Sequence, residues 1–152
     1  MKGIACRFRL RHLLTIAPTL LTLSIGIACS AVAQSKLYNP IALPTSNEVV
    51  DKLTESDIPT GLGGFARDYL VKLNKGDNVA IDLTSDSFDA MVTLLAADGT
   101  TISENDDGPD GTTNALLFTR IAEKKTYVVR VRAFGETGVG NFKLKVTRLR
   151  PT

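Results

Sequence analysis

The chain has 152 residues, which is enough for one domain. It contains two cysteines, one histidine and no tryptophan, and Cys6, Cys29 and His12 all lie within the first 33 residues. If those residues are a leader, the mature chain has no thiol nucleophile, histidine base, disulfide, or zinc site built from cysteine or histidine. The overall net charge of +2 also depends on the leader, so it gives no reason to expect nucleic-acid binding.

Residues 1–33 have the pattern of a secretory signal peptide. Four basic residues and no acid precede an apolar stretch at 13–29: Lys2, Arg7, Arg9 and Arg11. The small residues Ala31-Val32-Ala33 then suit signal peptidase. We therefore expect cleavage after Ala33, an exported mature protein that begins at Gln34, and no transmembrane segment after cleavage. Two alternatives stay open: an uncleaved anchor, for which the stretch is short, and a lipoprotein at Cys29, which Gly26 disfavours because lipid attachment prefers a leucine-like residue there.

The charges of the mature chain are unevenly distributed along it. Without the leader, 14 basic residues face 16 acids. Residues 34–119 contain five Lys or Arg and 14 Asp or Glu, whereas residues 120–152 contain nine and two. Either acidic and basic strands become neighbours in the fold, or the protein has an acidic end and a basic face.

Residues 34–64 form an N-terminal lead. Prolines at 40 and 44 precede a segment with strand character at 48–53. Three glycines and a proline at 59–64 then predict a loop, because this composition suits neither a helix nor a central strand.

Residues 65–150 show apolar residues at a period of two. The alternation predicts strands at 69–73, 79–84, 90–94, 101–103, 115–119, 127–133 and 142–146. Turn signals separate them, including Asn74-Lys75-Gly76-Asp77 and Asp98-Gly99. With the segment at 48–53, this makes seven to eight strands. We therefore predict an all-β fold, an antiparallel β-sandwich or jelly roll over 65–150 whose domain begins near residue 46.

Several segments resemble, in the same order, the bacterial pre-peptidase C-terminal domain. They are DYLVKL at 68–73, KGD at 75–77, FDAMVTL at 88–94, ENDDG at 104–108, TYVVRV at 126–131 and GNFKLKV at 140–146. The resemblance implies a β-sandwich module of secreted proteins, often attached to a protease. Because no peptidase precedes the domain in this sequence, we expect a stand-alone envelope or extracellular protein.

The acidic loop at 104–111 is the first candidate site. We predict Asn105, Asp106, Asp107 and Asp110 as calcium ligands, because calcium takes six to eight oxygens and a flexible acidic loop provides several. The resemblance adds that collagen-binding modules of secreted collagenases bind calcium near the matching loop. The spacing is not that of an EF-hand, and the alternative is a solvated turn. Glu48 and Asp57 complete a shell only if the N-terminal segment folds beside this loop.

The basic residues near the C-terminus are the second candidate site. If Val131 pairs opposite Leu144, one hairpin presents four cations on its outer side: Arg130, Arg132, Lys143 and Lys145. This face predicts an anionic ligand such as an envelope polysaccharide. The alternative is that Asp68, Asp82 or the acidic loop neutralises it. Aromatic residues do not interleave with these cations, which disfavours single-stranded nucleic acid.

Catalysis is the least favoured function class. The carboxylate pairs Asp106 with Asp107 and Asp86 with Asp89 allow glycosidase chemistry in principle, but aromatic sugar platforms are scarce. We predict a non-enzymatic secreted binding or structural module with calcium as its only cofactor. Its partner is an envelope polysaccharide or a secreted protein, and not nucleic acid. The alternatives are a folding or inhibitory partner of a secreted peptidase, and a carboxylate-dependent hydrolase.

Overall fold

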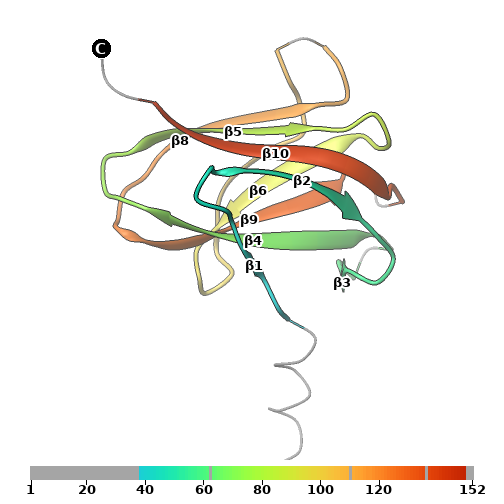
Figure 1. Ribbon diagram of the computed structural model, residues 1–152, viewed down its shortest axis with the longest axis horizontal. Helices are drawn as coiled ribbons and strands as arrows, with labels where there is room; N and C mark the ends of the chain where they lie inside the picture. The colour runs from blue at the N-terminus through green and yellow to red at the C-terminus, as the bar shows by residue number, and fades with distance from the viewer. Residues whose placement is uncertain (1–37, 62, 110, 136, 150–152) are drawn as a thin grey trace, which may run out of the picture.

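The computed structural model describes residues 38–149 apart from 62, 110 and 136. The predicted signal peptide, its cleavage site and Asp110 therefore lie outside the described residues. The described part is built from ten strands and no helix (Figure 1), so it contains no helix that could span a membrane. The strands are β1 (Ile41–Ala42), β2 (Glu48–Leu53), β3 (Ile58–Pro59), β4 (Phe65–Leu73), β5 (Asn78–Thr84), β6 (Ala90–Leu95), β7 (Thr101–Asn105), β8 (Ala115–Arg120), β9 (Lys125–Ala133) and β10 (Gly140–Leu149).

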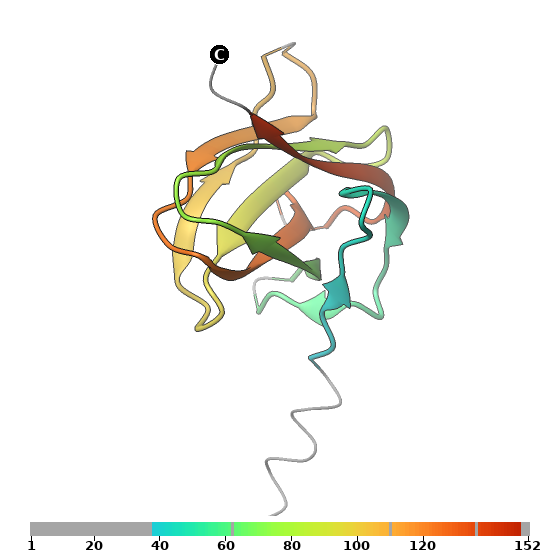
Figure 2. The same ribbon diagram turned by 60° about the vertical axis from the view of Figure 1, so that its left-hand side comes forward.

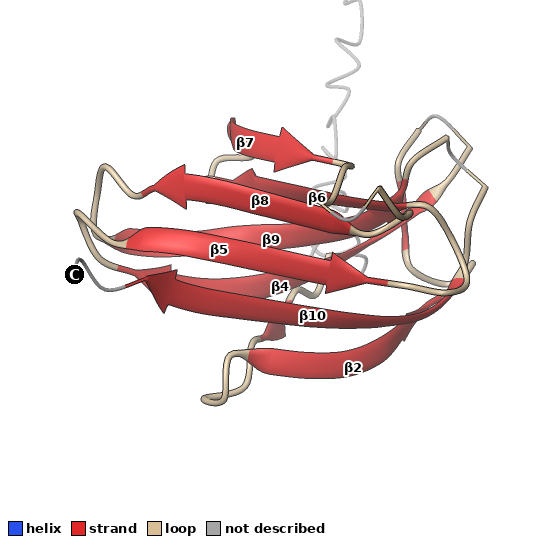
Figure 3. Ribbon diagram, turned by 90° about the horizontal axis from the view of Figure 1, so that it is seen from above, coloured by secondary structure: helices blue, strands red, loops and turns tan. Residues whose placement is uncertain are grey.

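Two sheets pack face to face and form a β-sandwich. Sheet A has the strand order β1-β4-β9-β6-β7, with β3 also paired to β4. Sheet B has the order β2-β10-β5-β8 and lies in front of sheet A in Figure 3. Apart from the parallel pair of β1 with β4, all pairs are antiparallel. The predicted fold class is confirmed.

The core lies between the sheets because alternate side chains of each strand point inward. Tyr69, Val71 and Leu73 of β4 are buried against the inward residues of sheet B, which include Ile81 and Leu144. All eight predicted strands are present. The sequence pattern missed β1 and β3, which are two residues long and too short to show alternation.

The N-terminal strands gather at one edge of the sandwich, beside β4 (Figures 1 and 2). β1 pairs with Tyr69 and Leu70, and β3 pairs with Phe65 and Ala66. β2 is the edge strand of sheet B and pairs with β10 from Glu48 to Leu53. The N-terminal segment thus closes the β4 edge, while β7 and β8 form the opposite edge.

Val131 does not pair opposite Leu144, so the condition for a basic face on one hairpin is not met. Val131 on β9 pairs with Arg67 and Val92 in sheet A, whereas Leu144 on β10 pairs with Val49 and Leu83 in sheet B. β9 belongs to sheet A and β10 to sheet B, so the segment between them crosses from one sheet to the other. The apolar residues of the two strands therefore face each other across the core. Because their outer sides point in opposite directions, Arg130 and Arg132 do not share a face with Lys143 and Lys145.

The loops divide between the two ends of the sandwich. One end contains the loops 54–57, 60–64, 85–89, 106–114 and 134–139, because β2, β5, β7 and β9 end there. The other end contains the turns 74–77, 96–100 and 121–124. This arrangement brings segments that are distant in sequence into one surface.

Candidate functional site

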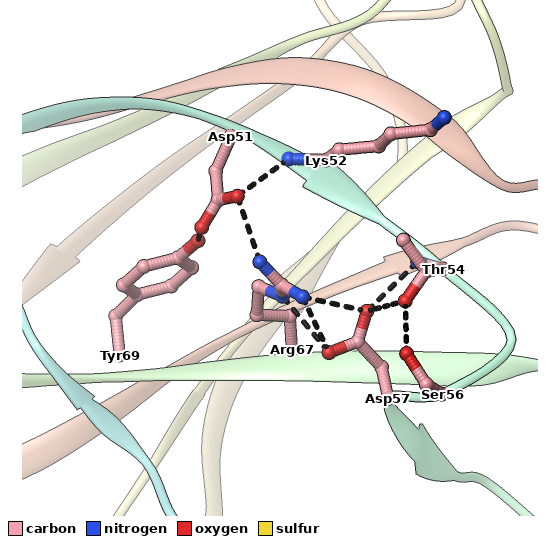
Figure 4. Close-up of polar contacts among 7 residues, drawn as sticks. All are labelled: Asp51, Lys52, Thr54, Ser56, Asp57, Arg67 and Tyr69. Carbon is pink, nitrogen blue, oxygen red and sulfur yellow. Dashed lines mark hydrogen bonds and ion pairs between the residues drawn. The ribbon is translucent and has the colours of Figure 1, made fainter.

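A partly buried polar cluster joins the N-terminal strands to β4 (Figure 4). The guanidinium of Arg67 lies 2.7 Å from Asp51 Oδ1 on β2 and 2.8 Å from Asp57 Oδ1 in the turn before β3. The Tyr69 hydroxyl donates a hydrogen bond of 2.7 Å to Asp51 Oδ2. Asp57 also accepts hydrogen bonds from the backbone N–H and the hydroxyl of Thr54, which close the turn.

Burial and the contacts within this cluster shift the pKa values of Asp51, Tyr69 and Arg67. Burial disfavours the charged form of Asp51, but hydrogen bonds from Tyr69, the Lys52 N–H and Arg67 outweigh burial and lower the pKa of its carboxyl. Burial, together with the bond to Asp51, raises the pKa of the Tyr69 phenol. Burial opposes the charge on Arg67, yet Asp57 and Asp51 raise its pKa. These shifts favour ionised Asp51, protonated Arg67 and neutral Tyr69, which suits a structural ionic clamp.

The structure describes three of the four predicted calcium ligands, Asn105, Asp106 and Asp107. The Asn105 amide donates hydrogen bonds of 2.7 Å to the Asp107 carbonyl and 2.9 Å to the Leu116 carbonyl, so it braces the loop against β8. Among the residues that the structure describes, no group of three acids is close enough to hold a metal. Asp106 and Asp107 remain predicted ligands, and Asp110 lies outside the described residues.

Glu48 and Asp57 do not lie beside that loop. β2 and β3 are at the β4 edge of the sandwich, and the loop follows β7 at the opposite edge. Glu48 forms an ion pair with Lys143, and Asp57 with Arg67. The condition under which these two acids would complete a calcium shell is therefore not met.

The four predicted cations lie on two separate faces, and three of them have acidic partners. Arg130 makes two hydrogen bonds of 2.8 Å to Asp68, whose side chain is 0% exposed. Lys143 lies 2.7 Å from Glu48, and Lys145 lies 3.9 Å from the same carboxylate. Arg132 has no ion pair within the described part of the chain. Acidic and basic strands thus neighbour one another, as one interpretation of the charge distribution predicted.

A second consequence of that distribution is an acidic end. The described residues of the loops 54–57, 60–64, 85–89, 106–114 and 134–139 include six acids and no Lys or Arg. We call this surface the acidic loop end; its acids are Glu55, Asp57, Asp86, Asp89, Asp106 and Asp107. Only Asp57 among these six forms an ion pair with a described residue.

The loop 85–89 is the centre of the acidic loop end. The buried Ser85 hydroxyl accepts hydrogen bonds from the N–H groups of Ser87 and Phe88 and donates one to the Asn141 carbonyl. The Ser85 N–H donates to Asn114 Oδ1, and the Phe134 N–H donates to the Asp89 carbonyl. The loop is therefore bonded to the two neighbouring loops and to β10.

Glycines allow the loop 134–139 to approach loop 85–89 closely. A Cβ on Gly138 would lie 2.4 Å from the Phe88 Cβ, and one on Gly140 would lie 2.3 Å from the Ser87 Cβ. Gly140 also has a φ of +142°, which side chains rarely adopt. The bond from the Phe134 N–H to the Asp89 carbonyl places Phe134, which is 52% exposed, next to Asp89. Val139, which lies between the two closely packed glycines, is also exposed.

Two polar hollows lie over the outer face of sheet B. One has a volume of about 280 Å³ and includes Asp86, and the other has a volume of about 300 Å³ and includes Asp82. Each contains a single carboxylate, so neither provides the two facing carboxyl groups that a glycosidase uses.

Comparisons with known proteins agree with this architecture. Residues 66–133 match the model of the bacterial pre-peptidase C-terminal domain family. The crystal structure of the pre-peptidase C-terminal domain of a collagenase from Bacillus anthracis aligns with a TM-score of 0.52 and 14% identity, over 72% of this chain and 93% of that chain.

Two further structures are periplasmic inhibitors of g-type lysozyme. The protein from Aeromonas hydrophila aligns with a TM-score of 0.49 and 12% identity, over 72% of this chain and 96% of that chain. The protein from Salmonella Typhimurium aligns with a TM-score of 0.45 and 11% identity, over 72% and 100%. No curated protein matches the sequence. The resemblance drawn from the sequence is confirmed: residues 66–133 match the bacterial pre-peptidase C-terminal domain family, and the fold resembles that of a solved member.

Proposed function

We propose that this protein is a non-catalytic, exported module that binds a basic partner protein through the acidic loop end. The observation that carries the proposal is the pairing of two joined loops: loop 134–139 exposes Phe134 and Val139, and loop 85–89 carries Asp86 and Asp89, which have no ion-pair partner among the described residues. Protein interfaces typically have an apolar centre with a polar rim, and unbalanced rim charge selects a partner of opposite sign.

The rigidity of the loops supports this proposal. Hydrogen bonds around Ser85 and the close approach of Gly138 and Gly140 hold the loops 85–89 and 134–139 in one arrangement. A surface that is ordered before binding loses less conformational entropy when the partner docks. A secreted peptidase with a basic surface is one partner of this class. The protein would then be an accessory or inhibitory partner of that peptidase, which is the alternative that the sequence also suggested.

Export is the second part of the proposal. It is supported by the pattern of residues 1–33 and by the presence of a pre-peptidase C-terminal domain. We expect mass spectrometry of the exported protein to find Gln34 at the N-terminus. A lipidated Cys29 or an intact leader would contradict this cleavage site.

The binding proposal is tested by selecting random displayed peptides on the exported protein. We expect enriched peptides to contain several Lys or Arg residues and to bind more weakly as salt increases, because the attraction between exposed charges is screened. Truncation of an exposed aromatic at an interface centre costs about 1–2 kcal/mol, so Phe134→Ser should weaken binding roughly tenfold. Asp89→Asn should weaken it less and reduce its salt dependence.

A matched control is available on another face. Phe118 is 62% exposed on the outer side of β8, and Phe118→Ser changes exposed apolar area by a similar amount. We expect this variant to bind the selected peptides as the unmodified protein does. Selection of peptides without basic residues, or equal losses from Phe118→Ser and Phe134→Ser, would overturn the proposal.

A further inference from the structure

The outer face of sheet B has two adjoining hollows, which together we call the groove. The two hollows described above, of about 280 and 300 Å³, share Thr84 of β5 and Lys143 of β10 as lining residues. The first extends to Asn141 and Ser87, and the second extends along the sheet to Asp82 and Lys145. Residues of one face repeat about every 7 Å along a strand, so the groove follows the strands over several side chains.

The groove is lined by hydrogen-bonding groups that the fold does not use. The side chains of Asn141, Ser87 and Asp82 make no hydrogen bond or ion pair to other described residues, and all three belong to rigid strands or to the braced loop 85–89. Lys143 is bound to Glu48, but both side chains are partly exposed, so Lys143 can also donate to a ligand. The groove therefore offers both donors and acceptors to a ligand.

The charges beside the groove compensate one another. Glu48 contacts Lys143 and Lys145, and Asp82 is the register partner of Lys145 on the neighbouring strand. A polyanion would meet these carboxylates together with the lysines. The arrangement instead suits a neutral ligand, which gains hydrogen bonds without having to displace an ion pair.

An apolar surface lies on the same face. Phe118 of β8 is the register partner of Ala80, which is the outward residue that precedes Asp82 on β5. Its exposed ring stands beside a small residue, so one side of the ring is accessible to a ligand. Sugars present hydroxyl groups at their edges and apolar C–H groups on their ring faces, and a site with polar groups beside an aromatic ring matches both.

We propose that the groove over sheet B binds a neutral glycan. Asp82, Asn141 and Lys143 would bind its hydroxyl groups, and Phe118 would contact a ring face. This site is separate from the Phe134 surface proposed above, and it replaces the anionic polysaccharide predicted from four cations on one hairpin.

The test is calorimetric titration of the exported protein with maltohexaose, cellohexaose and the hexamer of N-acetylglucosamine, beside a polyuronate of similar length. We expect at least one neutral oligosaccharide to bind and the polyuronate to bind at least tenfold more weakly. The double variant Asp82→Asn with Lys143→Met and the variant Phe118→Ser should each weaken the neutral ligand about tenfold, which corresponds to about 1.4 kcal/mol.

Phe134→Ser is the matched control and should leave glycan binding unchanged. The two proposals can therefore fail independently. A variant that loses peptide binding but keeps glycan binding bears only on the acidic loop end, and a variant with the reverse result bears only on the groove. A stronger titration by the polyuronate, no heat from any neutral oligosaccharide, or equal affinity for the double variant with an unchanged melting temperature would overturn the proposal.

Discussion

Replacing Arg67 with methionine should destabilise the fold because it leaves two carboxylates without their cation. Arg67, Asp51 and Asp57 are 19%, 28% and 13% exposed, so the cluster is mostly, but not fully, removed from water. Removing one partner of a fully buried ion pair costs about 3–5 kcal/mol. Partial solvent access reduces this, and we expect a loss of about 2–3 kcal/mol for Arg67→Met.

The measurement is urea unfolding at pH 7, with Lys52→Met as the control. Lys52 is an exposed cation on the same strand as Asp51, and its side chain makes no described contact. With an m-value of about 1–3 kcal/mol/M, Arg67→Met should lower the midpoint by roughly 1–2 M. Adding Asp51→Asn to Arg67→Met should recover part of the loss, because it removes an unpaired buried charge.

The effect should also depend on pH in a defined direction. The pKa of Asp51 is lowered in the folded protein, so its stabilising contribution is present above the unfolded value near 3.8 and is lost as the pH falls through the folded value. The difference between Arg67→Met and the unmodified protein should therefore shrink below about pH 4. A loss no larger than that of Lys52→Met, or a difference that grows on acidification, would refute the view of this cluster as an ionic clamp.

Three other outcomes follow from the described contacts. Arg130→Met should cost about 3–4 kcal/mol in urea unfolding, because its carboxylate partner has no access to water. Gly140→Ala should cost at least about 2 kcal/mol, since it places a Cβ against Ser87 at a positive φ, and a Ser87→Gly background should relieve the steric part. Millimolar calcium should raise the melting temperature relative to chelator, and the double variant Asp106→Asn with Asp107→Asn should remove that increase. If calcium does not change the melting temperature of the unmodified protein, the loop is only a solvated turn.

The alternation of apolar residues was sufficient to predict the sandwich and eight of its strands. Tyr69, Val71 and Leu73 mark the inward side of β4, and this phase also places Arg67 inward. A charged residue in the inward phase of a strand is a signal for a buried ion pair, and it was available in the sequence. The sequence did not identify Asp51 and Asp57 as the partners of Arg67, because no local pattern indicates that β2 and β3 lie against β4.

The sequence did not predict which strands pair with one another. The same period-two pattern fits a hairpin of β9 with β10 and a connection between the sheets, so the pattern could not assign Arg130 and Lys143 to different faces. The acidic loop end depends on the same information, because its loops are adjacent only after β5, β7 and β9 have been placed at one end. Charge segregation along the chain predicted an acidic end but not its location.

The central claim is tested most directly by a heteronuclear NMR titration of the protein with a selected basic peptide. We predict that the largest amide shifts occur in the loops 85–89 and 134–139, and that these shifts are lost in Phe134→Ser. The turns 74–77, 96–100 and 121–124 at the other end of the sandwich should not respond. Shifts concentrated in those turns, or spread evenly over both ends, would contradict binding at the acidic loop end.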